Sequence, residues 1–157
     1  MKLNELIATV FLLGKIPIAP GTMASLVTII FFYAFLLEAN IYIFLLIIFL
    51  TFMLALLNVS AYTEGSKDKD KSEIVIDEVI GQLISLTPII WYKDSLNNIY
   101  IFIWVSFFLF RFFDIVKPQP IKYFDRINKA WAVIIDDCVA GLFAAITLIL
   151  LIEYLAR

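Results

Sequence analysis

Long apolar runs separated by short polar segments dominate the chain. The runs are Thr22–Leu37, Ile41–Leu57, Ile74–Tyr92, Leu96–Phe113 and Trp131–Ile152. Their lengths are close to or below the ~20 residues that a helix needs to cross a bilayer. The pattern predicts an all-α, polytopic membrane bundle of about five spans, formed by one domain over residues 1–157. The first two runs are the shortest, and the sequence leaves open whether they cross fully.

The polar segments between the runs predict turns and loops. Asn4–Leu13 is expected to form a short helix at the membrane interface. Gly14–Gly21 is rich in proline and glycine and predicts a loop, after which Thr22 can cap the first long helix. Glu38–Asn40 predicts a tight turn, and the charged segment 58–73 predicts a solvated loop.

Composition supports a membrane protein and removes several kinds of chemistry. Hydrophobic residues make up 63% of the chain, whereas soluble domains are ~45–50% apolar. The net charge of −2 argues against nucleic acid as a partner. The chain has no histidine, which excludes the usual zinc sites and histidine general bases. The single cysteine, Cys138, is interpreted as a helix-packing residue, because Ala144 stands where a cysteine-phosphatase loop requires arginine.

Basic residues indicate the orientation. With the N-terminus inside, all of the 12 basic residues except Lys93 and Arg157 fall on the inner side of the predicted bundle. Such a bias is typical of cytoplasmic segments. The third and fifth runs, which contain paired acids, both begin at this face. We therefore expect a site at the cytoplasmic headgroup level.

Two acidic pairs interrupt the apolar runs, Asp77–Glu78 in the third and Asp136–Asp137 in the fifth. Gly81 and Gly141 follow each pair by one helical turn and allow close helix packing. Capping of a helix N-terminus explains either pair alone as well as a site does. Two pairs, with Asp114 nearby, favour a cation between them. Carboxylate donors without histidine suit Mg²⁺, and the four paired carboxylates are its expected ligands.

Groups suited to phosphate lie close to these acids in the sequence. Arg111 precedes Asp114 by three residues and Lys117 follows it by three, so both can approach its carboxylate on one helix face. Arg126 follows the Pro-Gln-Pro turn, and the helix that starts near Thr22 offers free N–H groups to an anion. Each basic residue alone is better explained by the positive-inside bias. Together with the acids, they indicate hydrolysis or transfer of a lipid-borne phosphate.

Three blocks of the chain resemble the phosphatidylglycerophosphatase A family. They are residues 17–26 (PIAPGTMASL), residues 74–82 (IVIDEVIGQ), and residues 110–126 (FRFFDIVKPQPIKYFDR) continuing to 135–141 (IDDCVAG). The third block is the longest and most specific. The resemblance covers nearly the whole chain.

The resemblance implies a Mg²⁺-dependent enzyme of the bacterial cytoplasmic (inner) membrane, with its active site facing the cytoplasm. It would convert phosphatidylglycerophosphate into phosphatidylglycerol and phosphate. The expected catalytic residues are Asp77, Glu78, Asp114, Lys117, Asp136 and Asp137, and the expected substrate-binding residues are Lys15, Thr22, Arg111, Asp125 and Arg126. Homo-oligomerisation is left open.

The sequence leaves open alternatives for both the mechanism and the function. In the favoured mechanism the metal activates a water for in-line attack, and its rival forms an aspartyl-phosphate on Asp136 or Asp114. A carrier of protons or cations also uses intramembrane carboxylates, but it predicts acids at more than one membrane level. A CDP-alcohol phosphotransferase would need a longer aspartate pattern, which is missing.

Overall fold

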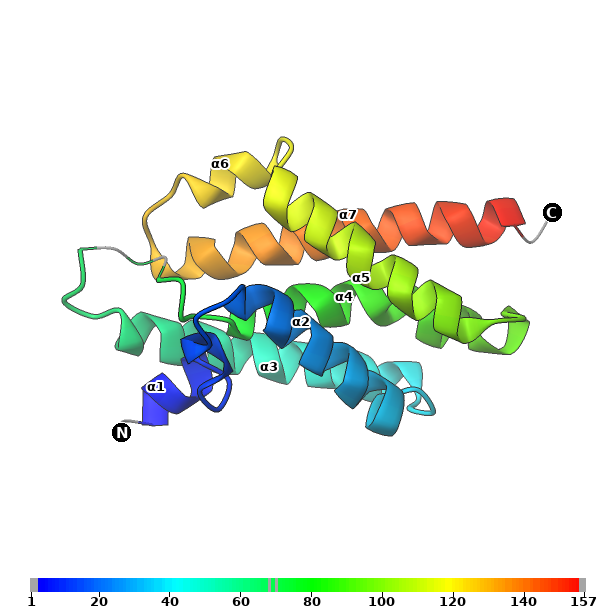
Figure 1. The fold of residues 1–157 in the computed structure, drawn as a ribbon, viewed down its shortest axis with the longest axis horizontal. Coiled ribbons are helices and arrows are strands. Elements are labelled where there is room, and N and C mark those ends of the chain that lie inside the picture. The colour runs from blue at the N-terminus through cyan, green and yellow to red at the C-terminus, as the bar shows by residue number, and fades with distance from the viewer. Residues whose placement is uncertain (1–2, 68, 70, 156–157) are drawn as a thin grey trace.

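The protein is a bundle of helices, seen in a computed structural model that describes residues 3–67, 69 and 71–155 (Figure 1). The helices are α1 (Leu3–Ala8), α2 (Pro20–Phe31), α3 (Ile41–Tyr62), α4 (Ile76–Tyr92), α5 (Ile99–Val116), α6 (Ile121–Asp125) and α7 (Ala130–Leu155). A π-helical segment, Phe32–Leu36, extends α2, and short 3₁₀ turns cover Leu13–Lys15 and Lys93–Ser95. The described residues include no β-strand, so the all-α prediction is confirmed. Lys2 and Arg157, both counted above to argue orientation, lie outside the described residues.

Helix α4 is the centre of the bundle. It contacts α2, α3, α5 and α7, and most of its residues are buried, including Ile80, Leu86 and Ile89 with no exposed surface. The outer helices instead expose large apolar side chains, such as Phe35 and Leu57. Apolar side chains on the outside and small or polar ones inside are typical of a bundle surrounded by lipid.

In the described part of the chain, three helices are long and apolar enough to cross a membrane, namely α3, α5 and α7. The other two predicted spans are also helices, but α2 with its π-helical extension and α4 are shorter. Helix α4 has 17 residues and carries Asp77 and Glu78 in its first turn. These three helices are those of a membrane protein. That α2 and α4 also cross the membrane stays a prediction.

Several predicted boundaries differ from the structure. Thr22 does not cap α2, because Pro20 occupies the first turn and Ala19 takes the N-cap position with no side-chain hydrogen bond. Helix α3 continues past Leu57 to Tyr62, and within it Asn58 Nδ2 donates to the carbonyl oxygen of Leu54 at 2.7 Å. The predicted interfacial helix ends early, at Ala8. Helix α6 was not predicted.

Candidate active site

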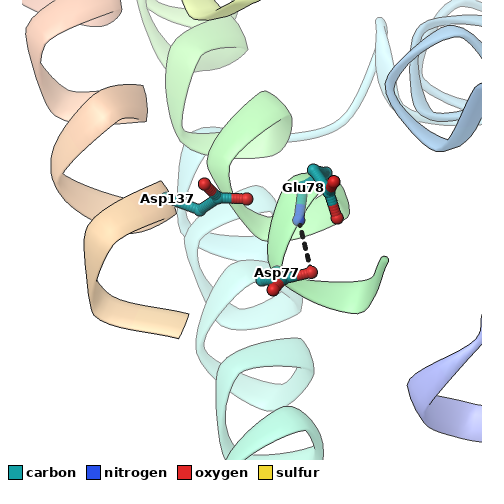
Figure 2. Close-up of side chains that lie close together, drawn as sticks. All are labelled: Asp77, Glu78 and Asp137. Atoms are coloured by element: carbon teal, nitrogen blue, oxygen red, sulfur yellow. Dashed lines mark hydrogen bonds between the residues drawn. The ribbon is translucent and has the colours of Figure 1, made fainter. Parts of the chain in front are cut away.

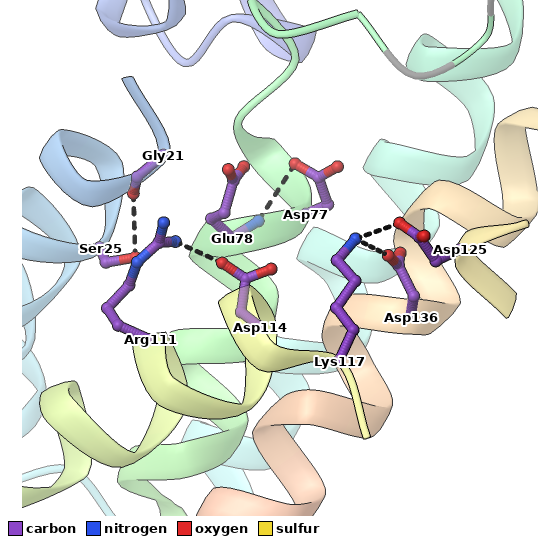
Figure 3. A network of polar contacts seen from close by, with 9 residues as sticks. All are labelled: Gly21, Ser25, Asp77, Glu78, Arg111, Asp114, Lys117, Asp125 and Asp136. Atoms are coloured by element: carbon purple, nitrogen blue, oxygen red, sulfur yellow. Dashed lines mark hydrogen bonds and ion pairs between the residues drawn. The ribbon is translucent and has the colours of Figure 1, made fainter. Parts of the chain in front are cut away.

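A polar cavity of about 250 Å³ lies where four helices meet at one end of the bundle. The start of α2, the start of α4, the end of α5 and the early turns of α7 surround it (Figure 3). Its polar lining consists of Thr22, Lys71, Ser72, Asp77, Glu78, Arg111, Asp114, Lys117, Asp136 and Asp137. Residues far apart in the sequence thus share one cavity, as the acidic pairs and basic residues predicted.

Three of the carboxylates that line this cavity lie close together. Asp77 and Glu78 of α4 and Asp137 of α7 each offer an oxygen, and these atoms lie within 4.8 Å of one another (Figure 2). Asp77 and Asp137 are each only 5% exposed. Asp77 also accepts a hydrogen bond from the backbone N–H of Glu78 at 3.1 Å. Like charges this close and this buried repel one another, so the cluster needs a cation or protons to be stable.

Close contact between α4 and α7 brings the carboxylates together. A Cβ built on Gly141 would lie 2.4 Å from the carbonyl oxygen of Gly81, and one on Gly81 would lie 2.7 Å from that of Asp137. Neither position therefore has room for a side chain. The two helix backbones touch one turn beyond the acids, which places Asp77 opposite Asp137.

The carboxylate cluster fits a divalent cation with oxygen ligands. Glu78 Oε2 is buried and has no hydrogen-bond partner among the described residues, so it retains its capacity to bind a metal. A Cβ on Gly21 would meet Glu78 Oε1 at 2.0 Å, so α2 packs directly against this side chain. Hard carboxylate oxygens are the donors that Mg²⁺ prefers. Among the described residues, Asp77, Glu78 and Asp137 are placed to hold such an ion together.

Asp136 lines the same cavity but has a different partner. Lys117 Nζ lies 2.7 Å from Asp136 Oδ2 and also pairs with Asp125 (Figure 3). Lys117 follows the last residue of α5 in a left-handed conformation, with φ of 46°. Burial lowers the pKa of Lys117, but its hydrogen bonds to the two aspartates raise it well above the ordinary value. Lys117 is therefore a permanent positive charge.

A second cation lies on the α2 side of the cavity. Arg111 Nη1 pairs with Asp114 Oδ2 at 2.7 Å, the i,i+3 contact that the sequence predicted. Figure 3 shows the guanidinium extending from α5 towards Ser25 of α2. Arg111 Nε is buried without a hydrogen-bond partner among the described residues. Together with the free N–H groups of the first turn of α2, it could bind an anion.

Comparison with known proteins identifies the family. Residues 6–152 match the family described as Phosphatidylglycerophosphatase A. The chain belongs to the phosphatidylglycerophosphatase A family. It is 37% identical to the phosphatidylglycerophosphatase A of Haemophilus influenzae, over 90% of this chain and 84% of that protein. It is 34% identical to that of Escherichia coli, over 90% and 78% of the two chains. No solved structure matches the chain.

A further relative carries a different name. The chain is 32% identical to a Bacteroides thetaiotaomicron protein named "Putative phosphatidylinositol-3-phosphatase", over 92% of this chain and 90% of that protein. The three relatives share a phosphatase name but differ in the lipid headgroup that the name specifies. Family membership therefore identifies the chain as a phosphatase and leaves the headgroup to be argued.

Not every expected residue lies at this cavity. Lys15 is exposed and pairs with Glu5 of α1, and this hydrogen bond raises the pKa of Lys15. Arg126 is exposed at the end of α6. Asp125 reaches the site only through Lys117. The cavity of this phosphatidylglycerophosphatase A family member thus includes eight of the eleven expected residues, because Lys15, Asp125 and Arg126 do not line it.

Two polar residues that line the cavity were not among the predicted site residues. Lys71 and Ser72 belong to a segment that was interpreted as a solvated loop, but they border the cavity. Lys71 Nζ lies over the ring of Tyr62, 4.7 Å from its centroid, which holds the loop against the end of α3. Lys71 and Ser72 come shortly before the Asp77–Glu78 pair in the sequence, and this was the signal that could have predicted their place at the cavity.

Proposed function

We propose that the protein hydrolyses the terminal phosphomonoester of phosphatidylglycerophosphate, giving phosphatidylglycerol and phosphate, with Mg²⁺ and at the cytoplasmic face of the bacterial inner membrane. The observation that carries this proposal is the buried cluster of Asp77, Glu78 and Asp137 facing the same cavity as Arg111 and Lys117. Metal ligands and phosphate-binding cations in one cavity suit a phosphomonoester. The family and two of the named relatives supply the substrate.

The acidic residues and the cations would have separate roles. When bound by Asp77, Glu78 and Asp137, Mg²⁺ would polarise the phosphoryl group and favour ionisation of a nearby water. Arg111 would orient the phosphoryl oxygens through its guanidinium. Lys117, always charged, would offset negative charge as the bond from phosphorus to the glycerol oxygen breaks. Because its pKa is raised, Lys117 stays protonated and positively charged, so it is not suited to act as a general base.

The choice between water and aspartate as nucleophile is open to experiment. Asp136 and Asp114 are each held by a cation, at 2.7 Å from Lys117 and Arg111 respectively. A carboxylate in an ion pair is a weaker nucleophile, which favours direct attack by water. Rapid quenching with radiolabelled substrate decides the point. Label that stays on the protein and disappears in Asp136→Asn or Asp114→Asn would establish the aspartyl-phosphate.

A second headgroup is favoured by the Bacteroides relative. Its name specifies a phosphorylated inositol lipid, and a phosphomonoester on a ring could use the same metal and arginine. The decisive assay measures phosphate release by the purified protein in detergent. It compares phosphatidylglycerophosphate, phosphatidylinositol 3-phosphate and glycerol 3-phosphate, each with and without Mg²⁺. Preference for the first lipid with Mg²⁺ is expected, and equal release without Mg²⁺ would contradict the proposal.

The carrier alternative is disfavoured by the arrangement of the acids. Asp77, Glu78, Asp114, Asp136 and Asp137 all border one cavity at one end of the bundle. A path for ions across the bilayer would need polar groups along the whole bundle. Ion flux into proteoliposomes by a protein that releases no phosphate would favour the carrier.

A further inference from the structure

An apolar groove follows the same two helices that form one side of the polar cavity. It has a volume of about 220 Å³ and is lined by Ile29, Ile30, Tyr33, Tyr100, Ile103 and Trp104. Ile29 and Ile103 form its buried floor, at 5% and 3% exposure. Ile30 and Trp104 are half-exposed or more, on opposite sides, so the groove opens sideways from the bundle.

The groove and the cavity lie along the same faces of α2 and α5. On α2, Thr22 lines the cavity, and Leu26, Ile30 and Tyr33 follow at helical spacing. On α5, the series Tyr100, Trp104, Phe107 ends at Arg111, which again lines the cavity. Residues three or four apart share one face of a helix. The interface between α2 and α5, where Leu26 and Phe107 pack into the apolar core, therefore lies between the charged cavity and the apolar groove, and we call this interface with the groove the seam.

The dimensions of this seam match one leaflet of a membrane. Eight residues separate Thr22 from Ile30, which corresponds to about 12 Å of helix. The hydrocarbon core is ~30 Å thick, so one leaflet is about 15 Å deep. At the far end, the rings of Tyr33 and Tyr100 approach to 5.7 Å between centroids and close the seam. A ligand with a charged head and an apolar tail fits such a seam.

We infer that the seam between α2 and α5 is the lateral entry and docking groove for one acyl chain of the lipid substrate. This inference rests on the proposed function and extends it from the headgroup to the chain. Apolar contacts give little affinity inside a bilayer, because lipid tails are as apolar as leucine. The groove instead orients the lipid, so that its phosphate lies between Arg111 and the carboxylate cluster.

Filling the groove tests this role by activity. Ile30→Trp is expected to lower kcat/KM on long-chain phosphatidylglycerophosphate about tenfold to hundredfold, as misplacement of a reacting group does. On a short-chain lipid with the same headgroup the loss should be much smaller, because a short chain does not reach the filled groove. Leu150→Trp is the matched control, because Leu150 is 65% exposed and Ile30 is 66% exposed. Leu150 belongs to α7, which does not form the seam. Equal losses on both lipids would overturn the inference.

Photolabelling tests the groove without turnover. The full chain is placed in liposomes with a lipid that carries a diazirine in its acyl chain and a non-hydrolysable phosphonate headgroup. Labels should concentrate on α2 and α5 around Ile30 and Trp104, more than with the same chain on phosphatidylcholine. A second apolar groove, which includes Leu45 and Trp91 between α3, α4 and α7, serves as the internal reference for bulk lipid.

The two tests separate the possible failures. If both grooves are labelled equally, or if the two headgroups give equal labelling, the inference about the seam is overturned, whether or not the protein releases phosphate. Selective labelling of α2 and α5 by a protein that releases no phosphate supports the seam and contradicts the proposed function.

Discussion

Asp137 lies beside the carboxylates of Asp77, Glu78 and Asp114 and has no ion-pair partner among the described residues, so its charge is costly without a metal. Asp137→Asn, like Asp77→Asn, is expected to lower phosphate release by more than about 100-fold, since even indirect metal partners contribute 10–100-fold. Without Mg²⁺ the variant should melt no lower than the parent, because a repulsion is removed. The parent's rise in melting temperature with Mg²⁺ should be absent.

Asp94→Asn is the control for these variants. Asp94 is exposed in the 3₁₀ turn after α4, at the end of that helix opposite its acids. It should retain activity and the Mg²⁺-dependent rise in melting temperature. Full activity of both Asp77→Asn and Asp137→Asn with excess Mg²⁺ would falsify the proposed metal site.

The close contact of Gly21 with Glu78 leads to a second prediction for a single residue. In Gly21→Ala the new Cβ would displace the end of Glu78, a flexible side chain that can move at low cost. We expect little change in melting temperature but about tenfold lower activity, because the metal ligand shifts. Ala39→Gly is the control and should keep its activity, since Ala39 lies in the turn before α3 and does not line the cavity. Unchanged activity in Gly21→Ala would show that Glu78 is not a ligand.

At the scale of elements, the contact of α4 with α7 sets the distance between the carboxylates. Gly141→Ala places a Cβ against the backbone oxygen of Gly81, which cannot move aside as a side chain can. We expect a destabilisation of about 1–3 kcal/mol, typical of overpacking, and a loss of activity larger than that of Gly21→Ala. Denaturation in detergent and phosphate release measure the two effects. Leu142→Ala, at the half-exposed neighbouring position, should change both little.

The elements themselves were largely predictable from the sequence. The five apolar runs correspond to α2 with its π-helical extension, α3, α4, α5 and α7. The spacing of Gly81 and Gly141 from their acids predicted the close contact between α4 and α7. The ion pairs of Lys117 were not predictable. Asp136 and Asp137 are adjacent on α7 and so point to different sides of the helix, and Lys117, in a left-handed conformation after α5, pairs with Asp136 of α7 and Asp125 of α6. A local sequence pattern does not encode such a contact between distant segments.

At the scale of the whole molecule, the bundle predicts which loops share a side of the membrane. The segment after α3 borders the polar cavity, whereas the turn after α4 lies at the other end of that helix. In a Cys138→Ser background, Glu64→Cys should react with an impermeant maleimide only in inverted vesicles, and Asn97→Cys only in intact spheroplasts. Reaction of both from one side would show that α4 does not cross. Reaction in the reverse pattern would contradict the cytoplasmic site.

The cavity takes its wall from α2 near the beginning of the chain and its third carboxylate from α7 at the end. During synthesis, catalysis must therefore wait until the ribosome has delivered the final helix and that helix has docked beside its neighbours. A nascent or truncated chain would be inert towards the surrounding lipids.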